Sequence, residues 1–304
     1  MNFPPEITAN VPAIIDYGHT WIIGHLEGQL GDFAFKQLLR AIGRVFPSLA
    51  EVDPRELVKR MGRMESAFYG MQDELRILRE LNPDWDIDSE LLEPAAQGFA
   101  SDTFAAIMES PNADKRDLLG RLIAKRLYSE TETANELYLR QAESVTRRAG
   151  QSHLWAIATL YLVHYPPLPS GLTREGMYAW MDANLWPILQ IVCKTDPSYD
   201  DLDYLTSLGV VLYDGSDKSS NLTLSEHAPA IEQRVLQATN EHFVPMSGQS
   251  VGLFYKKVHE LYEGKFSRTQ GQERISLAPY TLTLPGFTIG STIVERFLRE
   301  GQNA

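Results

Sequence analysis

The sequence predicts a mainly α-helical fold, a multi-helix bundle with a small winged-helix-like β element in its C-terminal half. Three observations support this prediction. Along most of the chain, apolar residues recur at spacings of three and four, as they do on one face of a helix. Three such patterns follow one another between Asp114 and Tyr165. The last of them, residues 153–163, is apolar on nearly every side, so we expect it to be enclosed by protein.

The first segment, residues 11–46, has a helical pattern that glycines interrupt. Gly24 and Gly28 are four residues apart, a spacing at which small residues let two helices approach closely. Asp16 and Glu27 are among the polar residues that make the segment too polar to enter a membrane. We therefore expect Gly24 and Gly28 to pack against a neighbouring helix, within the chain or in a dimer.

A long helix is predicted from Pro54 to Leu81, with Asp53 as its N-cap and proline in its first turn. Asn82 and Pro83 end it, and Asp88 or Ser89 is expected to cap the next helix. The long helix has one continuous apolar stripe, formed by Leu57, Met61, Met64, Phe68, Met71, Leu75 and Leu78. We expect the methionines of this stripe to fill the core.

The predicted helix 117–128 has leucines on one side and a dense group of cations on and near the other. These cations are Lys115, Arg116, Arg121, Lys125 and Arg126. They indicate either a solvated face paired with Glu130 and Glu132, or a face that contacts nucleic acid phosphates. The next helix ends at Gly150. His153 is expected to cap the apolar helix that follows.

The prolines and glycine of 166–171 separate two predicted domains, an N-terminal helical bundle (1–165) and a C-terminal helical domain (172–304). A short helix, Gly209, a strand at 210–213, a polar turn and a returning strand at 222–224 have the outline of a winged helix. Four aspartates precede that strand, which disfavours contact with DNA. The other helices and strand of this domain are predicted at 172–193, 226–242, 251–262, 287–298 and 280–284.

The composition argues against several classes of protein. The net charge of −12 disfavours broad binding to nucleic acid or anionic lipid, which needs a surplus of lysine and arginine. The first residues lack the pattern of a signal peptide, and no apolar run reaches the length of a membrane span. Cys193, the single cysteine, lies in an apolar run and is expected to be buried and inert. We therefore expect a cytoplasmic protein with no membrane contact.

No motif in the sequence indicates catalysis, a metal or a cofactor. The seven histidines lack the spacing of a ligand set, and the phosphate loop and the nucleophile elbow are both absent. The acidic run at 84–90 fails the calcium-loop pattern at its glycine and at its final glutamate. We expect no metal and no cofactor, and the catalytic residues are unknown. An active site assembled from residues scattered along the chain stays open.

Four segments in the middle and at the end of the chain are informative together: Leu118 to Arg126, Leu139 to Ala142, the apolar helix that ends at Tyr165, and Tyr280 to Gly290. They resemble an uncharacterised family of bacterial, mainly helical proteins. They correspond to about 114–165 and 280–290. The resemblance implies a helical fold and no particular activity.

These observations favour a non-enzymatic protein-binding or assembly module of a bacterial cytoplasmic system, with a protein partner or self-association. The candidate interaction residues are Gly24, Gly28, Arg121, Lys125 and Arg126. A nucleic-acid-associated winged-helix regulator is one alternative, and an enzyme whose site forms only in the fold is another.

Overall fold

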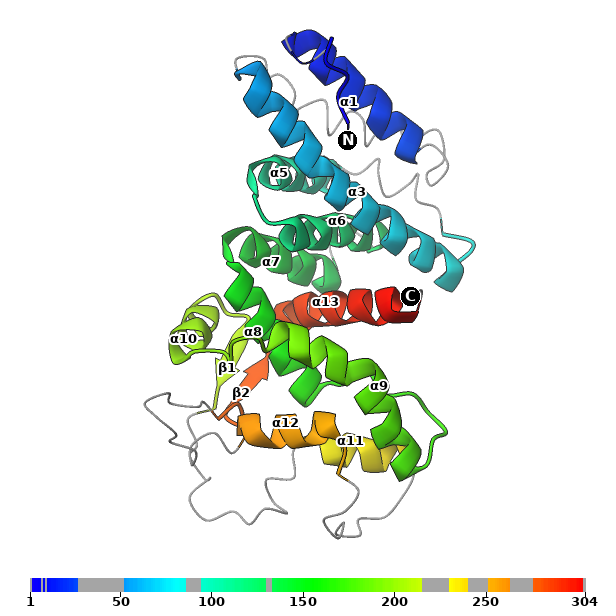
Figure 1. The fold of residues 1–304 in the computed structure, drawn as a ribbon, viewed down its shortest axis with the longest axis vertical. Helices are drawn as coiled ribbons and strands as arrows, with labels where there is room; N and C mark the ends of the chain where they lie inside the picture. Colours follow the sequence, from blue (N-terminus) through cyan, green and yellow to red (C-terminus); the bar gives the residue numbers. More distant parts are fainter. Residues whose placement is uncertain are drawn as a thin grey trace. The chain divides into compact units, whose positions relative to one another are not determined.

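A computed structural model shows that the chain is mainly helical, and its described residues include a small two-stranded antiparallel sheet. The structure describes residues 2–6, 8, 10–26, 52–85, 94–129, 133–214, 230–239, 251–262 and 276–302. No helix within these ranges is long and apolar enough to cross a membrane. The chain forms two compact units, Met1–Arg148 and Ala149–Ala304, each with its own packing (Figure 1).

The first unit is a stack of helices built around one long helix, α3. Its elements are α1 (Val11–Leu26), α3 (Pro54–Leu81), α5 (Pro94–Glu109), α6 (Ala113–Tyr128) and α7 (Ala134–Arg148). The Asp53 carboxylate accepts hydrogen bonds from the backbone amides of Arg55 (2.9 Å) and Glu56 (3.4 Å), which confirms the predicted N-cap of α3. All seven residues of the predicted α3 stripe are buried in one core with side chains of α5 and α6.

Helices α3 and α6 approach each other closely at two glycines. A Cβ atom built on Gly120 would lie 1.9 Å from the carbonyl oxygen of Ala67, and one on Gly70 would lie 2.6 Å from that of Asp117. Only a residue without a side chain fits at such a crossing. This close helix contact occurs at glycines other than the predicted pair. Gly24 is exposed and its Cβ would meet nothing within 4 Å, and Gly28 lies outside the described residues.

The second unit has the apolar helix α8 (Gln151–His164) at its centre. It packs against α9 (Arg174–Val192), α10 (Tyr199–Ser207), α11 (Ala230–Thr239) and α13 (Leu284–Gln302), which explains why it needs no polar face. Helix α12 (Leu253–Tyr262) packs against α9. The division between the units therefore precedes α8, whereas the sequence placed it after this helix.

The sheet of the second unit joins strands that are far apart in the sequence. Strand β1 (Val211–Tyr213) pairs with β2 (Tyr280–Leu282) in antiparallel register, with Val211 opposite Leu282. The predicted partner of β1, residues 222–224, lies outside the described residues. A winged-helix-like element is not confirmed.

Candidate functional site

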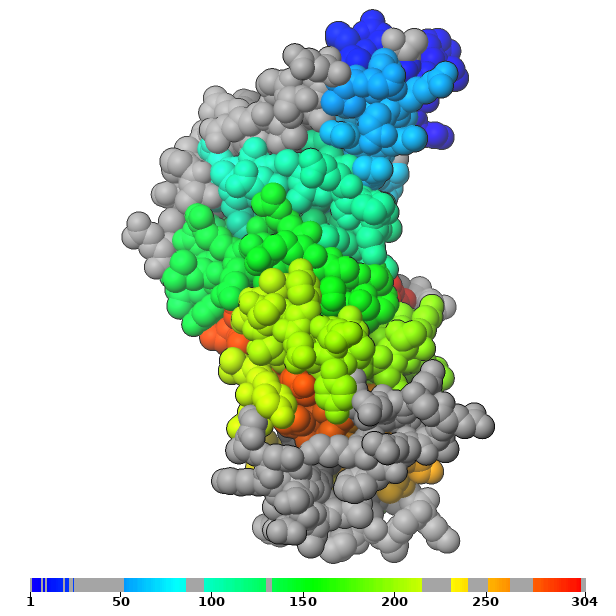
Figure 2. Space-filling view, turned by 90° about the vertical axis from the view of Figure 1, so that its left-hand side faces the viewer, coloured from blue at the N-terminus to red at the C-terminus, as the bar shows by residue number. Residues whose placement is uncertain are grey.

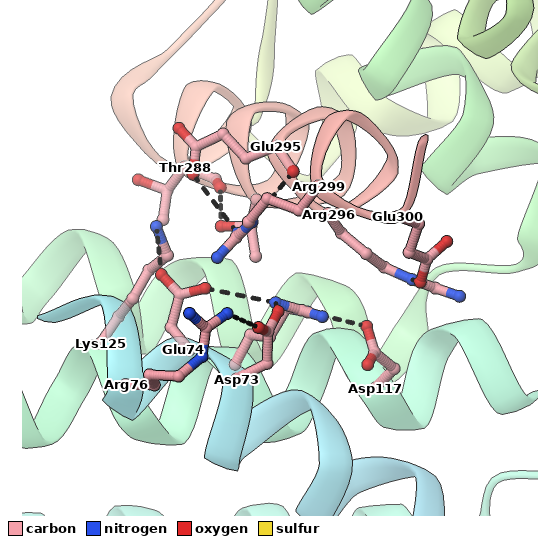
Figure 3. A network of polar contacts seen from close by, with 12 residues as sticks. Asp73, Glu74, Arg76, Asp117, Lys125, Thr288, Glu295, Arg296, Arg299 and Glu300 are labelled. Carbon is pink, nitrogen blue, oxygen red and sulfur yellow. Dashed lines mark hydrogen bonds and ion pairs between the residues drawn. The ribbon is translucent and has the colours of Figure 1, made fainter. Parts of the chain in front are cut away.

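Three of the five cationic residues predicted to form a solvated face contact carboxylates of the protein. Arg121 is only 4% exposed, and its guanidinium contacts Asp73 (2.7 Å) and Asp117 (3.0 Å). Lys125 Nζ lies 3.1 Å from Glu74 Oε1. Figure 3 shows Asp73 and Glu74 of α3 beside Asp117 and Lys125 of α6. The prediction of a solvated face is wrong for Arg121, because α3 supplies acidic partners to this side of α6.

Arg126 is buried in the same way, with 0% exposure. Its guanidinium contacts Glu136 Oε1 at 2.8 Å and donates to the carbonyl oxygen of Ser129 at 3.1 Å. The prediction of a solvated face is therefore wrong for Arg126 too, and α7 provides the buried carboxylate. The predicted partners Glu130 and Glu132 lie outside the described residues.

The other two cations of the predicted face also bind protein groups. Lys115 donates to the carbonyl oxygen of Arg147 (2.6 Å), and burial lowers its pKa. Arg116 donates to Ser66 Oγ (2.9 Å) and to the carbonyl oxygen of Ser110 (3.0 Å). All five cations thus connect neighbouring parts of the first unit, and a phosphate backbone would have to compete with these contacts.

Two other groups singled out in the sequence have structural roles. His153 caps α8 as predicted, because its Nδ1 accepts a hydrogen bond from the Gly150 amide (3.0 Å). Its Nε2 lies 3.4 Å from Asp201 Oδ1, so both ring nitrogens have a partner within the second unit. The thiol of Cys193 lies 3.2 Å from Thr159 Oγ1, and burial raises its pKa to about 11, which makes it unreactive.

A pocket that the sequence did not indicate lies between α5 and α7 in the first unit. It has a volume of about 270 Å³ and is lined by Gly98, Phe99 and Asp102 of α5 and by Arg140 and Glu143 of α7. In Figure 2 the green atoms of α7 lie beside the teal atoms of α5 and α6. The packing of α5 against α7 brings these residues together, and next to the pocket Thr103 of α5 is hydrogen-bonded to Glu143 of α7, 40 positions later in the sequence.

Glu143 is the buried charged group of this pocket, with 6% exposure. Its Oε1 accepts a hydrogen bond from Thr103 Oγ1 (3.3 Å) and lies 3.5 Å from Arg147 Nη1. Burial raises the pKa of Glu143 and the nearby Asp102 adds to the increase, while Arg147 and Thr103 oppose it. Both of these contacts are made by Oε1 of Glu143.

The other two charged residues of the pocket are Arg140 and Asp102. Arg140 directs Nε (3.0 Å) and Nη2 (2.8 Å) to Oε1 of Glu136, one turn earlier on α7. Asp102 is exposed, and among the described residues its carboxylate makes no hydrogen bond or ion pair. The pocket therefore presents the exposed carboxylate of Asp102 beside the buried carboxylate of Glu143, which is paired with Arg147.

The spacing of charged residues in the sequence indicated one side of this pocket. Glu136, Arg140, Glu143 and Arg147 recur at helical spacings of four and three, which places them along one side of α7. Such a row is typical of a solvated face, and only the contact with α5 buries Glu143. Among the described residues, no group of three or more His, Cys, Asp or Glu side chains is placed to hold a metal ion.

Comparison with known proteins gives no relative for this chain. No family model matches it, and neither a curated protein nor a solved structure is significantly similar to it. The resemblance to a bacterial helical family, seen in 114–165 and 280–290, therefore gains no support from these comparisons.

Proposed function

We propose that this protein is a protein-binding module, and that the α5–α7 pocket receives a side chain of its partner. The observation that carries the proposal is the buried carboxylate of Glu143, which lines the pocket and is paired with Arg147 at a distance of 3.5 Å. A buried charge without full pairing destabilises a fold, so such groups are concentrated at sites of function.

The size and charge of the pocket support the same function. A volume of about 270 Å³ lies just below the range of about 300–1,000 Å³ usual for small-molecule sites, and suits one inserted side chain. The chain has a net charge of −12, which favours encounter with a basic partner over an acidic one. A cytoplasmic location belongs to this proposal, because the single cysteine leaves no intramolecular disulfide to maintain.

The structure bears on the two alternatives, a nucleic-acid-associated regulator and an enzyme. The regulator hypothesis depended on a cationic face, and Arg121, Lys125 and Arg126 each contact a carboxylate of the first unit. The enzyme hypothesis gains one observation, since Asp102 and Glu143 are two carboxylates in unlike environments, as in general acid–base pairs. The polar groups of the pocket are few, however, and a bound side chain accounts for both carboxylates.

The proposal is tested with the whole chain purified from its own cell extract, its mass measured by light scattering. We expect a stoichiometric complex with a partner, or an oligomer, that the double variant Asp102→Asn/Glu143→Gln does not form. The matched control is Glu109→Gln, which removes an exposed carboxylate from α5 outside the pocket. A wild-type monomer without a partner, or a complex that both variants retain, would contradict the proposal.

A further inference from the structure

We draw no further inference here: the strongest candidate, the surface patch of the second unit where the exposed Leu284 and Phe287 of α13 lie beside Tyr165 and the stacked guanidinium of Arg234, is an apolar face, and nothing in the described part of the chain shows what covers it.

Discussion

One methyl group added at Gly120, where α6 crosses α3, should lower the stability of the protein. In Gly120→Ala, the new Cβ would lie 1.9 Å from the carbonyl oxygen of Ala67 and 2.7 Å from its carbonyl carbon, and contacts below 3.0 Å are essentially never adopted by real Cβ atoms. Both atoms belong to the backbone of α3, so no side chain can move aside. Helices α3 and α6 would therefore have to separate by about 1 Å.

The size of the effect follows from three contributions. Alanine gains about 1 kcal/mol over glycine within a helix. Overpacking of a tight interface costs about 1–3 kcal/mol. Separation of the helices also lengthens the ion pairs of Arg121 with Asp73 (2.7 Å) and of Lys125 with Glu74 (3.1 Å), which weakens both pairs without removing a partner. We expect Gly120→Ala to lower the free energy of unfolding by about 2 kcal/mol.

Urea unfolding followed by circular dichroism measures this change, with Gly62→Ala as the matched control. Gly62 lies on α3, and its Cβ would meet nothing within 4 Å, so its substitution should raise stability by up to about 1 kcal/mol. If Gly120→Ala were as stable as Gly62→Ala, α3 and α6 would not cross at the distance described, and the explanation for Gly120 would be refuted.

Three further substitutions test buried charges. Arg126→Met leaves the buried Glu136 without one of its cations and should cost about 3–5 kcal/mol in urea unfolding, whereas the exposed Arg148→Met should cost less than about 0.5 kcal/mol. Burial lowers the pKa of His164 from 6.5 to about 4, so as the pH falls this histidine is protonated in the unfolded chain before it is protonated in the folded one. The free energy of unfolding should therefore fall by about 3 kcal/mol as the pH decreases from 7 to 4. His164→Asn should reduce this loss, and a variant with the same dependence of stability on pH as the wild type would contradict the explanation. The folded-state pKa of Glu143 is raised, so its ionisation opposes folding as the pH rises through its ordinary pKa. Glu143→Gln should therefore keep the melting temperature at pH 7 or raise it, and a clear decrease would indicate a structural role.

Local patterns in the sequence predicted the helices well. The apolar stripe of α3 and its cap at Asp53 depend on residues within a few turns of each other, and the structure confirms both. The cap of α8 by His153 is likewise local, because the hydrogen bond joins residues three positions apart in the sequence. The pattern of 153–163 likewise predicted a helix enclosed on all sides, as α8 is.

Contacts between distant residues were not predictable in the same way. The polar side of α6 was expected to face water, because a single sequence does not show that α3 brings Asp73 to Arg121 from 48 residues away. Strand β1 pairs with β2, about 70 residues later, whereas the nearest apolar segment suggested a local hairpin. Gly120 carries no periodic signal, and its role depends on the distance between two helices.

The same limit applies to the candidate pocket. Glu143 belongs to a row of alternating charges on α7, and such a row is typical of an exposed helix face. Its burial depends on Phe99 and Thr103 of α5, a helix for which the sequence gave only a possible start. A pocket built from two helices is visible only once their packing is known.

The most direct test of the proposed binding site is hydrogen exchange of the full chain, alone and in complex with its co-purified partner. Binding through the pocket predicts slower exchange in α5 (Pro94–Glu109) and α7 (Ala134–Arg148) in the complex, and no such change in the Asp102→Asn/Glu143→Gln variant. Protection confined to other elements, with α5 and α7 exchanging as in the free chain, would contradict the proposed site.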